Sequence, residues 1–242
     1  MPDFLRIYSR QEYLTPGAPA TVEVIAATVR PSEETWLLDM ASGKGEAAAT
    51  LASRFACRIV AVDLYDPFIH YATAKFWHFN LRDLVTVVRG SGRSLPVRDG
   101  AVDAAYCIGA PSIVGLESAL GELARVARPG GHVVVSDIVW RVQPDPPLGK
   151  EWRWLADAQP KLSAEEYTGA IGRAGLTVER THIHPLSDWE EYWRPMLEVA
   201  AEAKTSQPAD VFFADDVESG VALERRAVER YIDYATFVAR KA

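Results

Sequence analysis

The sequence is poor in cysteine and has no long apolar run. Its two cysteines, Cys57 and Cys107, are too few for a disulfide framework or a multi-cysteine metal site, which is typical of a reducing cytoplasm. No apolar run approaches the ~20 residues that span a bilayer. The opening MPDFLRIYSR has neither the basic start nor the apolar core of a signal peptide. We therefore expect a cytoplasmic protein with no membrane partner.

Concentrated positive charge is also missing. The chain has 26 basic and 33 acidic residues, which gives a net charge of −7. Proteins that bind nucleic acid through its phosphates normally present a basic face, and no cluster of lysine and arginine stands out in this sequence. We expect no nucleic-acid partner.

What is present is an alternation of short apolar runs and helical patterns. The composition, 48% apolar and 24% charged over 242 residues, is that of an ordinary globular protein. The apolar runs predict strands over 35–40, 58–63, 84–90, 102–109 and 132–139, with helices over 45–56, 66–80 and 116–128. Strands separated by helices favour a parallel sheet that is covered by helices on both faces.

The pattern changes after residue 140. A proline-rich loop over 141–149 comes first, and Ser163 with Glu166 then forms the capping box of a helix that ends near Arg173. The remaining expected elements are a strand over 176–184, a helix over 188–204 that Pro195 kinks or restarts, a charged helix over about 217–230 and a strand over 234–240. We expect a single domain over 1–242, with a core over 18–140 and helical additions over 141–230.

The turn after the first predicted strand carries the clearest functional signal. Asp39 ends that strand, and the small residues that follow let a ligand approach the backbone at the start of a helix. Gly43, Gly45 and Ala48 satisfy the dinucleotide fingerprint, and Asp63 lies 20 residues after Gly43, where an acid accepts bonds from ribose hydroxyls. The segment is therefore expected to bind a nucleoside-containing ligand.

Two such ligands compete, a nicotinamide dinucleotide and S-adenosylmethionine. A pyrophosphate gains nothing from the neighbouring carboxylate of Asp39, whereas the cationic amino-acid end of S-adenosylmethionine does. The sequence also lacks a Tyr-x-x-x-Lys pair, since Tyr106 is followed by Ala110 and Tyr167 by Ile171. An NAD(P)-dependent oxidoreductase is therefore the alternative hypothesis.

Several segments together resemble the class I S-adenosylmethionine-dependent methyltransferases. LLDMASGKGE resembles their motif I, AVDLY their acidic second-strand end, DGAVDAAYC their fourth-strand motif, LARVARPGGHVVVSD the segment leading into their fifth strand and AIGRAGLTV the approach to their sixth strand. The resemblance covers roughly 18–185 and is nearest to a small-molecule, methyltransferase type 11-like bacterial subgroup. It implies a Rossmann-like, doubly wound, mostly parallel seven-stranded sheet with helical additions after strands 5 and 6.

The resemblance also implies the function and the cofactor site. It predicts methyl transfer from S-adenosyl-L-methionine to a small molecule by direct in-line displacement. The residues that frame the methionine part of the cofactor are then Asp39, Ala41, Ser42, Gly43 and Gly45. Ala41 stands where the family usually has its first glycine.

For the rest of the cofactor, the resemblance predicts that Asp63 accepts both ribose hydroxyls and that Leu64 packs on the adenine face. Ser91 stands where the family often has aspartate, and the backbone N–H of Gly92 is expected to serve a ring nitrogen. The resemblance places Cys107 and Ile108 at the end of the fourth strand, beside the transferred methyl group.

Candidates for the acceptor side come from the segment that leaves the fifth strand. Ligands of α/β sheets bind beyond the carboxyl ends of strands. Trp140 and Arg141 lie at this place in the chain, and an aromatic wall with a guanidinium suits a planar or anionic molecule. We therefore predict both as substrate-binding residues. The other interpretation of the tryptophans in this half of the chain is that they pack the added helices onto the sheet; these are Trp140, Trp152, Trp154, Trp189 and Trp193.

No catalytic dyad is expected, because methyl transfer needs a general base only when the nucleophile is protonated. His182 and His184 alternate on a predicted strand with Asp188 nearby, and they are either bases or structural strand-end residues with no metal constellation around them. Lys44 is either a solvated loop charge or a partner of the cofactor carboxylate. Because Ala41 and Ser91 depart from the family pattern, a non-catalytic protein that binds S-adenosylmethionine or S-adenosylhomocysteine is a further alternative.

Overall fold

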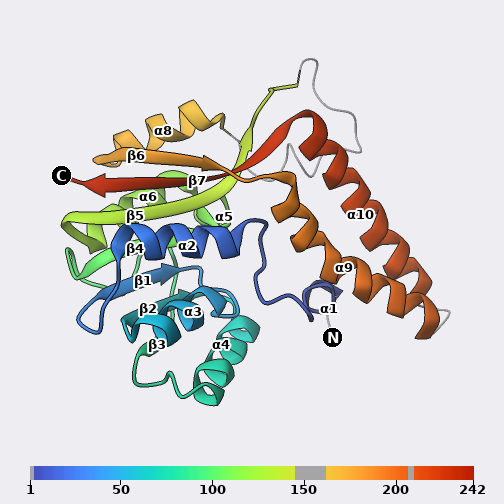
Figure 1. Cartoon of the computed structure of the whole chain (residues 1–242), viewed down its shortest axis with the longest axis horizontal. Helices are drawn as coiled ribbons and strands as arrows, with labels where there is room; N and C mark the ends of the chain where they lie inside the picture. Colours follow the sequence, from blue (N-terminus) through green and yellow to red (C-terminus); the bar gives the residue numbers. More distant parts are fainter. Residues whose placement is uncertain (1–2, 145–161, 207–209) are drawn as a thin grey trace.

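The computed structural model describes residues 3–144, 162–206 and 210–242 (Figure 1). Its strands are β1 Trp36–Met40, β2 Arg58–Asp63, β3 Val85–Arg89, β4 Val102–Ile108, β5 Ala127–Trp140, β6 Leu176–Ile183 and β7 Ile232–Lys241. They form one seven-stranded sheet in the order β3-β2-β1-β4-β5-β7-β6. All neighbouring pairs are parallel except β5–β7 and β6–β7, because β7 runs antiparallel to both neighbours. The predicted mostly parallel seven-stranded α/β sheet is confirmed.

The described helices are α1 Asp3–Ile7, α2 Ala18–Val29, α3 Glu46–Phe55, α4 Asp66–His78, α5 Pro111–Val114, α6 Leu116–Val126, α8 Ala164–Arg173, α9 Leu186–Ser206 and α10 Val211–Arg230. The helices α2, α3 and α4 pack on one face of the sheet, and α6 and α8 pack on the other. Successive side chains of a strand point to opposite faces. Leu37 of β1 accordingly packs in an apolar cluster with residues of α2, α3 and α4, whereas Leu38 packs in a second cluster with residues of α6 and α8.

Three boundaries differ from those predicted. β5 begins at Ala127, before the predicted strand over 132–139, and includes Pro129, Gly130 and Gly131, with a shift of register opposite β4 between Val102 and Ala104. α9 continues through Pro195 as one helix instead of restarting there. α10 begins at Val211, earlier than its charged sequence indicated. Most of the predicted proline-rich loop lies outside the described residues.

The helices α9 and α10 lie beyond one end of the sheet (Figure 1). Trp189 and Trp193 of α9 are buried in a cluster with Val221 of α10 and Tyr234 of β7. These two tryptophans therefore pack the added helices onto the sheet, as one of the two interpretations predicted. No helix in the described part of the chain is both long and apolar enough to cross a bilayer.

Candidate cofactor pocket

The turn between β1 and α3 has the conformation that its small residues predict. Gly43 and Gly45 both have positive φ angles, 54° and 75°. A Cβ atom at Gly45 would lie only 2.6 Å from Cζ of Phe76, so this position has no room for a side chain. Ala41 also has a positive φ, 55°, where a residue with a Cβ is strained. This is the position at which the resemblance expects glycine.

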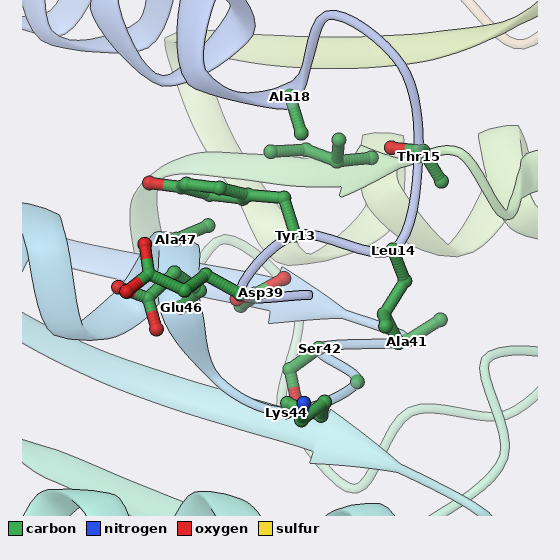
Figure 2. Close-up of a pocket in the computed structure, with 13 residues that line it drawn as sticks. Tyr13, Leu14, Thr15, Ala18, Asp39, Ala41, Ser42, Lys44, Glu46 and Ala47 are labelled. Atoms are coloured by element: carbon green, nitrogen blue, oxygen red, sulfur yellow. The ribbon is translucent and has the colours of Figure 1, made fainter. Parts of the chain in front are cut away.

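One oxygen of the Asp39 carboxyl is buried without a partner. Only 2% of the residue is exposed, and its Oδ2 atom has no hydrogen-bond partner in the described structure. Burial raises the pKa of this carboxyl well above its usual range; the nearby hydroxyl of Tyr106 partly offsets this rise in pKa, and the charge of Asp63 adds to it. The hydroxyl of Ser42 is likewise buried and unpaired. Both residues line the same pocket, so the pocket wall offers an unused acceptor and an unused hydroxyl (Figure 2).

This pocket is small, with a volume of about 60 Å³. Five of the predicted cofactor residues line it, namely Asp39, Ala41, Ser42, Gly43 and Ile108. Much of the remaining wall comes from the segment before α2, whose Tyr13, Leu14 and Thr15 run across the β1–α3 turn (Figure 2). Sequence reasoning missed this segment, because residues 8–15 show no periodicity and no motif.

Asp63 lies at the end of β2, next to this turn. Its Oδ2 accepts a hydrogen bond from the N–H of Gly43 at 2.8 Å, and its Oδ1 accepts one from the N–H of Tyr65 at 2.8 Å. The carboxylate therefore joins the β1–α3 turn to the β2–α4 connection. Each oxygen has further acceptor capacity, since a carboxylate offers about four lone-pair sites.

The other predicted cofactor residues lie outside the wall of this small pocket. Leu64 is 58% exposed beside Asp63. Ser91 accepts a hydrogen bond from the N–H of Arg93, and Gly92 packs so closely against Val114 that a Cβ would lie 2.9 Å from its Cγ1. The thiol of Cys107 is buried, and burial raises its pKa. Their predicted cofactor contacts stay predictions, as does that of Gly45.

Lys44 is not a solvated loop charge, because it is buried. Its expected pairing with the cofactor carboxylate stays a prediction. Its ammonium donates hydrogen bonds to the backbone carbonyls of Gln11, at 2.7 Å, and Tyr8, at 3.1 Å. The side chain is buried, and burial lowers the pKa of the ammonium. Lys44 thus connects the turn to the segment that crosses it.

The two residues predicted for substrate binding lie at the end of β5. Nη1 of Arg141 pairs with Asp233 at 2.9 Å, and Nη2 donates to the carbonyls of Val228 and Glu229. Trp140 packs against the cluster that joins α9, α10 and β7. Neither residue lines the small pocket, and their role toward a substrate stays a prediction.

His184 has a structural setting. Its Nδ1 lies 2.7 Å from Oδ2 of Asp188, and its Nε2 lies 2.8 Å from the hydroxyl of Thr236. Thr236 in turn lies 2.7 Å from the hydroxyl of Thr21. Burial lowers the pKa of His184. These contacts fasten the end of β6 to β7, α2 and α9.

Asp137, at the carboxyl end of β5, was not singled out from the sequence. Its Oδ2 accepts hydrogen bonds from both the N–H and the hydroxyl of Ser112, at 2.9 and 2.6 Å, and its Oδ1 accepts one from the N–H of Ile138. Burial raises the pKa of this carboxyl. The preceding residue, Ser136, pairs with Ile108 of the pocket wall, so Asp137 is a nearby buried acid.

Comparison with known proteins agrees with this description. Residues 38–135 match the family model described as a methyltransferase domain. An O-methyltransferase of Pyrenophora dematioidea is 27% identical over 175 residues, covering 69% of this chain and 64% of that protein. A demethylmenaquinone methyltransferase of Thermus thermophilus is 35% identical over 115 residues, covering 47% of this chain and 49% of that protein. The chain thus spans less than two thirds of the length of these relatives.

A solved structure extends the likeness to the whole fold. A SAM-dependent methyltransferase from Geobacter sulfurreducens, crystallised with S-adenosyl-L-homocysteine, superposes with a TM-score of 0.83 at 22% identity, covering 100% of this chain and 98% of that one. The sheet is thus that of a Rossmann-like methyltransferase fold. Residues 38–135 thus match a methyltransferase domain, and the whole described chain shares the fold of that structure.

Proposed function

We propose that this chain transfers a methyl group from S-adenosyl-L-methionine to a small-molecule acceptor. The observation that carries the proposal is the buried Oδ2 atom of Asp39, which has no hydrogen-bond partner in the described structure and belongs to a residue in the wall of the pocket. A buried acceptor without a partner costs about 1–3 kcal/mol, and more when it is charged. A ligand that brings a cationic donor to this position removes that cost, and the amino group of S-adenosyl-L-methionine is such a donor.

The other groups around the turn fit the rest of this cofactor. The unpaired hydroxyl of Ser42 and the free N–H groups at the start of α3 suit a carboxylate. Asp63 keeps acceptor capacity for ribose hydroxyls beside the two bonds that it already accepts. We propose Leu64, Ser91 and Gly92 for the adenine, and Cys107 with Ile108 for the surroundings of the methyl group.

The chain's contribution to catalysis is then mainly positioning. When bound, the cofactor supplies an electron-poor sulfonium methyl group. Orienting two reactants in contact contributes roughly 7–11 kcal/mol in favourable cases. For an acceptor that must lose a proton, we propose Asp137, a buried acid next to the strand partner of Ile108, and its hydrogen bonds from Ser112 fix its orientation.

The acceptor and the cellular setting belong to the same proposal. We propose a small-molecule acceptor in a cytoplasmic enzyme that needs no nucleic acid, with the chain working as one domain. Trp140 and Arg141 are proposed to border the acceptor side. Since the Arg141 guanidinium is already bonded to Asp233 and two carbonyls, its contribution would be to hold that border in place.

The test is a calorimetric titration of the purified protein with S-adenosylhomocysteine, with NAD and NADP titrated in parallel. We expect micromolar binding of S-adenosylhomocysteine alone. Binding of a dinucleotide alone would overturn the proposal in favour of an oxidoreductase. Tight binding of S-adenosylhomocysteine without turnover of any acceptor in a broad small-molecule panel would favour a non-catalytic binding protein.

A further inference from the structure

Lys44 of the β1–α3 turn reaches out of the turn and holds the preceding part of the chain. We call residues 8–15 the strap. Two strap carbonyls, those of Gln11 and Tyr8, accept hydrogen bonds from the Lys44 ammonium at 2.7 and 3.1 Å. The ammonium also lies 5.1 Å from the centre of the Tyr71 ring. Within the described residues Lys44 forms no ion pair, although the charges of Glu46 and Glu12 lie near enough to favour the ammonium.

Burying the Lys44 ammonium has a cost in free energy. Removing an ammonium from water is unfavourable, and lysine is almost never buried without a partner. A lysine in an exposed turn would ordinarily stay in solvent. Here it is 9% exposed, and its bonds go to a segment more than thirty positions earlier in the chain. The strap is thereby fixed against the turn that we propose to hold the cofactor.

The strap forms one wall of the pocket, opposite the β1–α3 turn. Leu14 comes so close to the turn that a Cβ at Gly43 would lie 3.1 Å from its Cδ1. Thr15 leaves no room for a side chain at Gly109, the residue after β4. With the strap in this position the pocket measures about 60 Å³. Pockets for drug-sized ligands span about 300–1,000 Å³, so the space under the strap suits only a part of such a ligand. The methionine end of the cofactor is the part that we propose for this pocket, and the strap covers it there.

The outer side of the strap is tied to α9. The side-chain amide of Gln11 donates to the carbonyl of Tyr192 at 2.8 Å, and the hydroxyls of Tyr8 and Tyr192 lie 3.1 Å apart. Arg10 pairs with Glu202 at 2.6 Å. These contacts hold the outer side of the strap on α9. The inner side is held on α3 by Tyr13, whose hydroxyl lies 3.0 Å from that of Thr50, and on the β1–α3 turn by Lys44. Lys44 is therefore the hydrogen-bonded contact between the strap and the turn itself.

We propose that Lys44 is a positioning residue that holds the strap over the cofactor pocket. The cofactor then enters and leaves only when the two hydrogen bonds between Lys44 and the strap are broken, and we call these two bonds the latch. The inference rests on the proposed function. It predicts that loss of the ammonium speeds both the association and the dissociation of S-adenosylhomocysteine. A lysine that merely held the ligand would change dissociation alone.

The experiment compares wild type with K44M, K44R and the control K204M. K44M keeps a side chain of similar length but removes its positive charge. K44R restores a donor, and Lys204 is a lysine of α9 that pairs with Asp215 and Glu218 away from the strap. Association is measured by surface plasmon resonance with S-adenosylhomocysteine, and dissociation by dilution into excess unlabelled ligand after loading with the radiolabelled form. Trypsin cleavage after Arg10 reports strap release without any ligand.

We expect both rate constants of K44M to rise about tenfold, as two lost hydrogen bonds of modest strength allow, with cleavage after Arg10 faster by a similar factor. K44R is expected to recover most of the wild-type behaviour, and K204M to match wild type. Faster dissociation with unchanged association, or unchanged cleavage, would overturn the latch. If wild type fails to bind S-adenosylhomocysteine while K44M is still cleaved faster, the proposed function fails and the latch stands.

Discussion

Replacing Asp39 with asparagine should make the protein more stable and the cofactor site weaker. The substitution keeps the shape of the side chain and removes the charge. In the folded chain the carboxyl is almost completely buried, and one of its oxygens has no hydrogen-bond partner in the described structure. Asparagine still buries polar atoms but carries no charge, so D39N removes the cost of ionising a buried carboxyl. Each pKa unit corresponds to about 1.4 kcal/mol, so D39N should raise the free energy of unfolding by about 1–3 kcal/mol at pH 7. For a chain of this length the melting temperature should rise by about 2–10 °C.

The pH dependence of this gain has a definite sign. Burial raises the pKa of Asp39 in the folded state above its value in the unfolded chain. As the pH rises through the window between these two values, the unfolded chain ionises first, and the wild-type protein loses stability relative to D39N. Below the unfolded pKa, near ~4, both states are protonated and the ionisation penalty disappears. The gain from D39N should therefore shrink as the pH falls toward 4.

The assay is thermal and urea unfolding of D39N and wild type between pH 4 and 8, with calorimetric titration of S-adenosylhomocysteine at pH 7. Loss of a charged hydrogen bond of about 1.5–3 kcal/mol should weaken binding by about 10- to 100-fold. D83N is the matched control, since the Asp83 side chain is 90% exposed and the same chemical change there should alter stability by less than about 0.5 kcal/mol. A D39N protein that is less stable than wild type at pH 7 would refute the reasoning, as would unchanged affinity.

Three further substitutions test other parts of the structure. D63A should weaken S-adenosylhomocysteine binding by at least about 10-fold in calorimetry, since a charged hydrogen bond contributes about 1.5–3 kcal/mol, and unchanged affinity would mean that the ribose site is misplaced. G17A should lower the free energy of unfolding by more than about 2 kcal/mol in urea, because φ is +64° and a Cβ would collide with the His184 ring. R141M should lower the melting temperature by breaking the pair with Asp233 while leaving S-adenosylhomocysteine affinity unchanged, and a large loss of affinity would contradict that placement.

Local signals predicted most of the fold. Each short apolar run became a strand within a few residues of its expected bounds, because strands buried on both faces need continuous apolar sequence. The capping box of Ser163 and Glu166 formed as expected. The start of α10 was missed, since the apolar Val211 and its neighbours gave no charged pattern from which to extend the helix. Pro195 was expected to kink or restart α9, and the helix instead continues through it as one element. Trp193 before the proline and Met196 after it both pack in the cluster that joins α9 to β7.

The pocket was only half predictable. Asp39, Gly43 and their neighbours are consecutive in sequence and were found through their spacing. The strap has no such signature, and the target of Lys44 lies far away along the chain, so only three-dimensional packing reveals the contact. That the Asp39 oxygen lacks a partner is also a property of its surroundings, which a sequence does not encode locally.

The antiparallel pairing of β6 with β7 has a consequence for how this protein can diversify. Ile183 at the end of β6 pairs with Ala235 of β7, so the chain that carries α9 and α10 departs from the sheet and rejoins it at one point. The cost of closing a loop grows only slowly with its length. Changes of length in this helical pair, away from the cluster of Trp189, Trp193 and Tyr234, are therefore expected to leave the strand register unchanged.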